Sequence, residues 1–279
     1  MRQLVQPGPI HPSRIDSFAG EPIACTFDLR PGQTLIDALT APLALAGFQG
    51  ATLTFAGAEL NPFRYVMPGP PDDATHVAYF TAPHAPAGAV RIELANATFG
   101  WAAGKPFLHC HAVWTESDGT RRGGHILPQE TVLAAPAQAH AWGFHNIRIE
   151  AAPDAETNFT LFQPGGASTE GARGIVARVR PNQDITTAIE TIARVHGIAD
   201  AVIRGSLGSL IGARFTDGTA ISDIATEVLV RRGVLRNGIA ELDLLVVDME
   251  GRVHEGWLER GENPVCITFD VVLEAVSVA

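Results

Sequence analysis

The sequence predicts an α+β protein made of two tandem copies of one domain, each a mainly antiparallel sheet packed with one main helix. Three observations lead to this prediction: a helical segment occurs twice, a β-hairpin pattern follows it twice, and a Gly-rich stretch separates the two copies. With 279 residues, 46% of them hydrophobic, the chain is long enough for two domains with separate cores. This composition excludes collagen-like, low-complexity and fully disordered proteins.

The first repeated element is a helical segment. The stretches that begin at Arg30 and Arg180 align without a gap, and six of 22 positions are identical. Asp184 and Gly197 are the predicted N-cap and C′ residue of the second helix. Pro42 lies in the middle of the first segment, so we expect that helix to be kinked or interrupted. The second segment has the apolar spacing of an amphipathic helix, at Ile185, Ala188, Ile189, Ile192 and Ala193.

The second repeated element is a β-hairpin. Residues 107–127 align with residues 239–259 at an offset of 132, and Gly119 falls on Gly251. Both stretches read as a strand, an acidic turn with glycine and a second strand. The helical segments are 150 residues apart, so the first copy has 18 extra residues. We place them within residues 62–101, a Pro-, Ala- and Gly-rich stretch that we expect to form a loop or a cover.

These repeats divide the chain into four parts. Residues 1–19 are a predicted N-terminal extension, and residues 20–150 form the first domain. Residues 151–171, with a polar and Gly-rich second half, are the predicted linker. Residues 172–279 form the second domain.

Charge and cysteine content limit the function. The 20 basic and 30 acidic residues give a net charge of −10, which argues against binding to nucleic acid. The three cysteines, Cys25, Cys110 and Cys266, form no paired motif, which fits a reducing compartment. Neither a signal peptide nor an apolar run of about 18 residues is recognisable, so we expect a cytoplasmic protein with no membrane partner.

Three histidines of the first hairpin are the candidate metal ligands. His109 and His111 alternate with Cys110 on one predicted strand, so both imidazoles point to one face while Cys110 points to the core. The turn at Gly119 would place His125 opposite His111. Three converging imidazoles can hold Zn²⁺ or a similar divalent transition metal. The alternative is that they are ordinary polar residues on a solvated face.

Catalytic residues are not defined by the sequence. Three protein ligands with an open fourth position are typical of catalytic zinc. Glu130, five residues after His125, is the nearest candidate general base, and the alternative is an exposed carboxylate at a strand end.

The histidine motif resembles a known family. The sequence reads HCH at 109–111, DG at 118–119 and GGH at 123–125, with a Gly-rich stretch at 205–218 in the second copy. This pattern is similar to the plant and prokaryote conserved (PPC) domain, and the resemblance extends over most of both copies. It implies an α+β domain that assembles as a trimer and, in prokaryotic members with three histidines, binds metal. Plant members also carry AT-hooks that bind DNA, but this sequence has no Arg-Gly-Arg-Pro hook.

Two function classes follow, and a third is weaker. The first is a metal-binding, PPC-like homo-oligomer, expected to be a trimer, that serves as a regulatory or interaction module. The second is a metal-dependent hydrolase or lyase acting on a small polar substrate. DNA binding, which rests on the family label alone, is the weakest.

The second copy is predicted to lack the metal site. At the offset of 132, the three histidines fall on Glu241, Asp243 and Trp257. An indole nitrogen only donates hydrogen bonds and cannot ligate a metal. We therefore expect this copy to be a structural partner in which Trp257 fills the space that a metal would occupy in the first copy.

Overall fold

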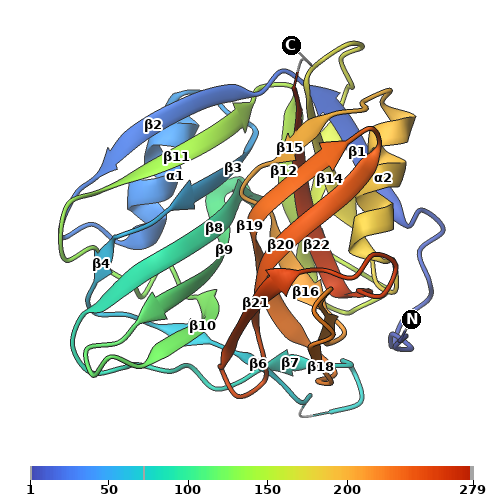
Figure 1. Ribbon diagram of the computed structural model, residues 1–279. Helices are drawn as coiled ribbons and strands as arrows, with labels where there is room; N and C mark the ends of the chain where they lie inside the picture. The colour runs from blue at the N-terminus through green and yellow to red at the C-terminus, as the bar shows by residue number, and fades with distance from the viewer. Residues whose placement is uncertain (1, 72, 277–279) are drawn as a thin grey trace.

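Two antiparallel sheets face each other, and one helix covers the outer side of each sheet (Figure 1). This arrangement is seen in a computed structural model that describes residues 2–71 and 73–276. The helices are α1 (Leu35–Leu45) in the first copy and α2 (Ile185–Val195) in the second. The predicted α+β fold with one helix per copy is confirmed.

The first sheet belongs to the first copy. Its strands run in the order β2-β11-β3-β8-β9-β10-β5, with β4, β12 and β13 beside this path. Only the short contact between β12 and β8 is parallel among its described pairings. A separate pair, β6 and β7, follows β5. The bounds are β2 (Ile23–Leu29), β3 (Gly50–Phe55), β4 (Glu59–Leu60), β5 (Tyr65–Val66), β6 (Pro68–Gly69), β7 (Tyr79–Phe80), β8 (Val90–Ala102), β9 (Lys105–Thr115), β10 (Arg121–Ile126), β11 (Ala137–Phe144), β12 (Ile147–Pro153) and β13 (Thr160–Gly166).

The second sheet has the order β1-β14-β22-β15-β19-β20-β21, and β16 pairs with β19 and β22. A small pair, β17 and β18, lies apart from it. The bounds are β1 (Ile15–Gly20), β14 (Gly174–Val179), β15 (Ala201–Ile203), β16 (Leu207–Leu210), β17 (Ala213–Arg214), β18 (Ala220–Ile221), β19 (Thr226–Arg236), β20 (Ile239–Val247), β21 (Val253–Trp257) and β22 (Val265–Ala275).

Both helices begin where their caps predict. The Asp184 side chain caps α2 by accepting a hydrogen bond from the Thr187 backbone N–H, and Thr34 caps α1 in the same way. Gly197 follows α2 with φ of 67°, the left-handed conformation that ends many helices. The expectation that Pro42 interrupts α1 is wrong, because the helix continues through this residue to Leu45. Burial of the α1 apolar face, including Leu39 and Leu43, stabilises the helix although Pro42 has no backbone N–H to donate a hydrogen bond.

The inner faces of the two sheets form the contact between the copies. Asn96 on β8 is buried, and its Nδ2 donates to the backbone carbonyls of Ser206 (3.0 Å) and Val230 (2.8 Å) in the second copy. These bonds satisfy buried polar groups in the middle of the contact. Apolar side chains from both copies surround them, at Val113, Leu207, Leu229, Leu245 and Val247.

Two segments differ from the predicted domain plan. Within the predicted extension, Ile15 begins β1, which pairs along its whole length with β14 of the second copy. Within the predicted linker, β13 pairs with β12 and packs Phe162 between the copies. The strand β13 was not predicted because the residues that follow Phe162 are polar and Gly-rich. The strand β1 was not predicted because its partner, β14, lies about 160 residues away in the sequence.

A buried ion-pair network secures β1. The Asp154 carboxylate accepts from Arg178 (2.7 Å) and Arg180 (2.9 Å), and Arg180 also reaches Asp16 on β1 (2.8 Å). Burial alone would raise the pKa of Asp154, but Arg178 and the Thr157 hydrogen bonds lower it to about 2. The carboxylate therefore stays ionised and, through Arg180, connects the segment after β12 to Asp16 on β1.

The hairpin alignment is confirmed by strand register. His125 pairs with His111 across β9 and β10, and Trp257 pairs with Asp243 across β20 and β21. Gly119 has φ of 88°, as its place in the turn requires. Among the described residues, neither helix is long and apolar enough to span a membrane.

Candidate functional site

The structure brings the three predicted histidines together on the inner face of the first sheet. One nitrogen from each of His109, His111 and His125 lies within 4.8 Å of the others, and the Nε2 atoms of His109 and His111 are 3.0 Å apart. Cys110 points to the opposite face and is fully buried in the core beneath α1. Strand alternation and hairpin register thus produce the predicted cluster.

The second copy holds two of these rings in place. His109 Nδ1 donates to Asp270 Oδ2 on β22 (3.1 Å), and His111 Nδ1 donates to the Val228 carbonyl on β19 (3.1 Å). A carbonyl or carboxylate oxygen accepts only, so each Nδ1 carries the proton. When both rings are neutral, each Nε2 atom therefore carries a lone pair.

This arrangement has the donor set of a metal site. Two lone pairs 3.0 Å apart repel each other unless a proton or a cation lies between them. The Nδ1 atom of His125 is also buried without a hydrogen-bond partner. Neutral imidazoles held by a carboxylate or a backbone carbonyl are the usual nitrogen ligands of divalent transition metals. The residues present therefore fit such an ion.

Two of the rings, those of His111 and His125, favour the neutral form. Burial, together with the neighbouring His109 and His125, lowers the pKa of His111 well below its usual value of 6.5, against a smaller opposing effect of the Val228 hydrogen bond. Loss of water and the neighbouring His109 lower the pKa of His125 to about 3. At neutral pH, both side chains offer lone pairs rather than charge.

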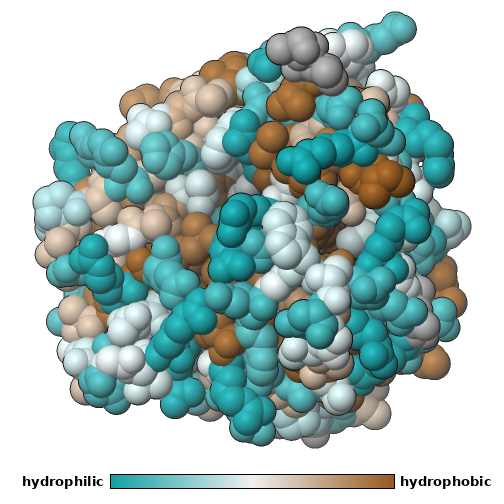
Figure 2. All heavy atoms as spheres, in the orientation of Figure 1, coloured by the Kyte–Doolittle hydropathy of each residue, from teal (hydrophilic) through white to brown (hydrophobic). Residues whose placement is uncertain are grey.

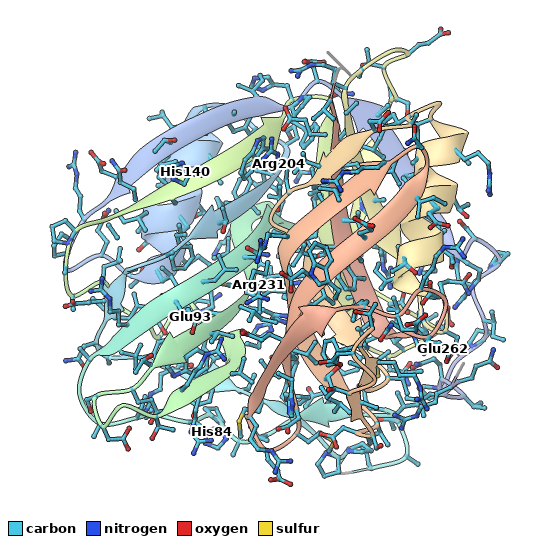
Figure 3. All side chains as sticks on the ribbon, viewed as in Figure 1. His84, Glu93, His140, Arg204, Arg231 and Glu262 are labelled. Atoms are coloured by element: carbon cyan, nitrogen blue, oxygen red, sulfur yellow. The ribbon has the colours of Figure 1, made fainter. Side chains whose placement is uncertain are left out.

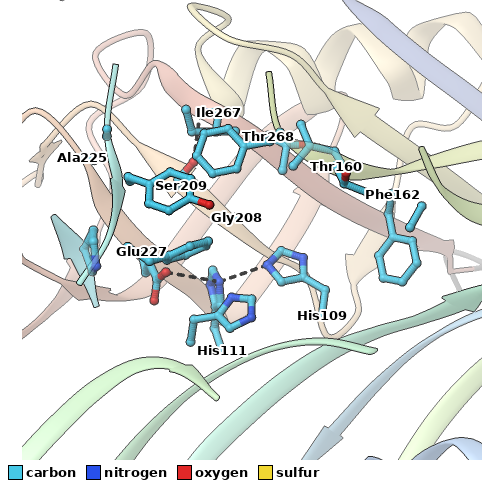
Figure 4. A pocket seen from close by; sticks show the side chains of 18 of the residues that line it. His109, His111, Thr160, Phe162, Gly208, Ser209, Ala225, Glu227, Ile267 and Thr268 are labelled. Atoms are coloured by element: carbon cyan, nitrogen blue, oxygen red, sulfur yellow. Dashed lines mark hydrogen bonds and ion pairs between the residues drawn. The ribbon is translucent and has the colours of Figure 1, made fainter. Parts of the chain in front are cut away.

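A carboxyl group from the second copy lies beside the cluster. Glu227 on β19 is buried, its Oε1 is 3.9 Å from His111 Nε2, and its Oε2 has no hydrogen-bond partner (Figure 4). Burial raises the pKa of Glu227 well above its usual value. A group able to accept or donate a proton therefore lies next to the three histidines.

The cluster forms one wall of a cavity of about 260 Å³ between the two copies (Figure 4). The extra stretch of the first copy contributes β7 to its wall. Ser209, Thr226 and Ile267 of the second copy line another side. The remaining walls are largely aromatic, formed by Tyr79, Phe80, Phe107, Phe159 and Phe162.

The other predicted site residue lies elsewhere. Glu130 is exposed and is not among the described residues that line the cavity. It follows the end of β10, where the backbone turns away from His125. Glu227, which comes from the other copy, is the carboxyl group that the structure places near the histidines. His140 is also remote, because it lies exposed on β11 and bonds to Thr26 (Figure 3).

In the second copy, an ion pair takes the position of the histidines. Asp243, the counterpart of His111, is fully buried and accepts from Arg231 through both oxygens (2.8 and 3.0 Å). The expectation that Trp257 fills this space is wrong, because its side chain is 41% exposed. Arg231 comes from the neighbouring strand β19 and neutralises the aspartate, so no aromatic filler is needed.

Sequence reasoning missed Asp270 and Glu227. Neither has a ligand-like spacing to the histidines, and both come from the copy that lacks the motif. One signal was present: each is an acidic residue with apolar neighbours in a strand, and a buried charge needs a partner. The partner itself could not be read from the sequence, because it depends on how the two sheets face each other.

Solved structures similar to this chain each cover about half of it. A metal-containing protein of Archaeoglobus fulgidus is 18% identical, with a TM-score of 0.43, over 52% of this chain and 97% of its own. A plant- and prokaryote-conserved (PPC) protein of Pyrococcus horikoshii is 16% identical, with a TM-score of 0.41, over 50% and 91%. A hypothetical protein of Salmonella cholerae-suis is 15% identical, with a TM-score of 0.41, over 53% and 96%. No family model and no curated protein matches the chain.

The lowered histidine pKa values predict an acid-sensitive metal-free protein. The pKa values of His111 and His125 in the folded state lie below the unfolded value near 6.5, so the unfolded state takes up more protons as pH falls. With chelator present, the free energy of unfolding should decrease below about pH 6.5, by up to about 1.4 kcal/mol per pH unit for each group.

Denaturant unfolding between pH 7 and 4.5 measures this slope. A His125→Gln variant should show a shallower slope, whereas His140→Gln, at an exposed position, should keep the original one. Equal slopes for the original protein and His125→Gln would contradict the neutral state of His125.

Proposed function

We propose that this protein binds one divalent first-row transition metal ion per chain through His109, His111 and His125, and presents it to a small molecule in the cavity between its two copies. The observation that carries the proposal is the approach of the Nε2 atoms of His109 and His111 to 3.0 Å. Zinc is the expected metal, because it accepts three imidazoles in a tetrahedral site. A metal-containing protein among the similar structures accords with this proposal.

The chain's own residues prepare the site. Asp270 and the Val228 carbonyl orient two imidazoles, and the aromatic walls limit access of water. A metal ion held by these histidines would supply a Lewis acid beside the cavity. Because a cavity rather than a flat surface lies beside the cluster, small-molecule binding is favoured over a flat interaction surface.

A metal-dependent hydrolase or lyase is the second candidate function, and Glu227 is the observation that favours it. This carboxyl group lies in the cavity wall 3.9 Å from His111. A raised pKa near a metal site is typical of a general acid or base. Glu227 is thus the candidate catalytic residue, in place of the exposed Glu130. DNA binding gains no support from the fold, whose net charge is −10.

Metal content tests the proposed function. Purified protein should hold about one metal ion per chain, and His111→Ala should hold almost none, because two imidazoles alone bind metal weakly. His140→Ala is the matched control, since it removes an exposed histidine that is remote from the cluster. Elemental analysis after dialysis gives the stoichiometry, and circular dichroism verifies the fold.

His111 is buried, so its replacement by alanine also removes packing. A His125→Ala variant provides a second measurement, because His125 makes no hydrogen bond through its buried Nδ1 atom. Metal content equal to that of the original protein in both folded variants would disprove the assignment.

The oligomeric state remains a proposal. We propose a trimer, as the PPC resemblance implies, and the face in Figure 2 shows brown apolar side chains among the teal polar ones. Exposed apolar side chains such as Leu45 and Ile239 are available for contact. Light scattering at micromolar concentration should give about three times 29.6 kDa, and a mass of 29.6 kDa would rule the trimer out.

A further inference from the structure

The cavity beside the histidines has the size of a small ring compound. Its volume is about 260 Å³, and an apolar cavity of about 150 Å³ is large enough to hold benzene. The space therefore takes one six-membered ring and a few further atoms. It is too small for a nucleotide or a long acyl chain, which occupy larger pockets.

Aromatic side chains surround this space on several sides. Phe107 and Phe162 pack edge to face with their ring centres 5.7 Å apart, and Phe80 lies 5.2 Å from His125. Phe159 packs against both Tyr79 and Phe80 of β7, with its ring centre 5.4 and 6.1 Å from theirs. Aromatic rings prefer offset or edge-to-face neighbours, so such walls select a flat ring.

The charges of the cavity favour an uncharged ligand. Among the described residues that line it there is no lysine or arginine, and the one acidic residue is Glu227. A metal ion at the histidines would attract one anionic group, but a phosphate or a dicarboxylate would find no cationic side chain for its remaining charge. An ammonium group would be repelled by a metal ion at the histidines.

The carboxyl group of Glu227 in the cavity wall is best satisfied by a ligand group that can both donate and accept a hydrogen bond. Glu227 Oε2 is buried without a partner, and an unpaired buried oxygen is costly. A hydroxyl group satisfies Glu227 in either protonation state, because it can donate to a carboxylate or accept from a carboxylic acid. Its oxygen can also approach the histidine cluster.

We propose that the cavity binds an uncharged, single-ring aromatic molecule with one hydroxyl group, whose ring lies among the phenylalanines and whose hydroxyl faces Glu227 and the histidines. This inference rests on the proposed function, since the metal is the second partner of the hydroxyl oxygen. It replaces the polar substrate expected from the sequence by a ligand that is mainly apolar.

Phenol is the probe, and the full-length protein loaded with Co²⁺ is the receptor. Titration calorimetry gives affinity, and the visible absorption bands of Co²⁺ report whether the hydroxyl group reaches the metal. Phenol should bind about tenfold or more tightly than benzene, which lacks the hydroxyl, and than methanol, which lacks the ring. In metal-free protein, benzoate, of similar size but charged, should bind more weakly than phenol, because no cationic side chain is among the lining residues.

Two variants locate the ligand. Thr160 is exposed on β13 and lines the cavity, so Thr160→Trp should fill its opening and weaken phenol binding about tenfold or more. Thr115→Trp, at an exposed strand position that is not among the lining residues, should bind phenol like the original protein. Glu227→Leu should bring the affinities for phenol and benzene close to each other.

The outcomes separate the two proposals. Failure to bind Co²⁺ would overturn the proposed function, and this inference with it. Bound Co²⁺ with no response to phenol, or tighter binding of benzoate than of phenol to the metal-free protein, would overturn only the ligand class. Unchanged phenol affinity in Thr160→Trp would show that phenol binds elsewhere and would overturn the cavity assignment.

Discussion

The packing of the two sheets against each other is the constraint on which the site depends. The motif histidines all lie in the first copy, but the acceptors that orient them, Asp270 and the Val228 carbonyl, belong to the second. Asn96 fixes this arrangement by bonding to two second-copy carbonyls in the middle of the contact. A first copy alone would have three histidines on an open sheet face, with neither oriented tautomers nor a cavity.

Duplication has allowed the two copies to take different roles. At equivalent positions of the same hairpin, the first copy has His111 and the second has Asp243, which Arg231 neutralises. The second copy thus keeps the scaffold, closes the cavity and contributes Glu227. Its own buried carboxylate is satisfied internally, which leaves the histidine cluster as the candidate metal centre among the described residues.

Local patterns predicted most of the fold and part of the site. The offset of 132 predicted which residues pair across both hairpins, because strand alternation and turn length set register within a short stretch. Long-range pairing was not predictable: β1 joins β14, and Glu227 reaches His111, across more than 100 residues. Propensity also misled at Pro42, where tertiary packing keeps α1 continuous.

X-ray absorption spectroscopy at the metal edge tests the central claim most directly, that three imidazoles closed in by the second copy bind a transition metal. Protein loaded with Zn²⁺ should show three imidazole nitrogens at about 2.0–2.1 Å, with one further light-atom ligand. Sulfur at about 2.3 Å would instead point to one of the cysteines, Cys25, Cys110 or Cys266. Either sulfur or a shell of oxygens without imidazole scattering would contradict the claim.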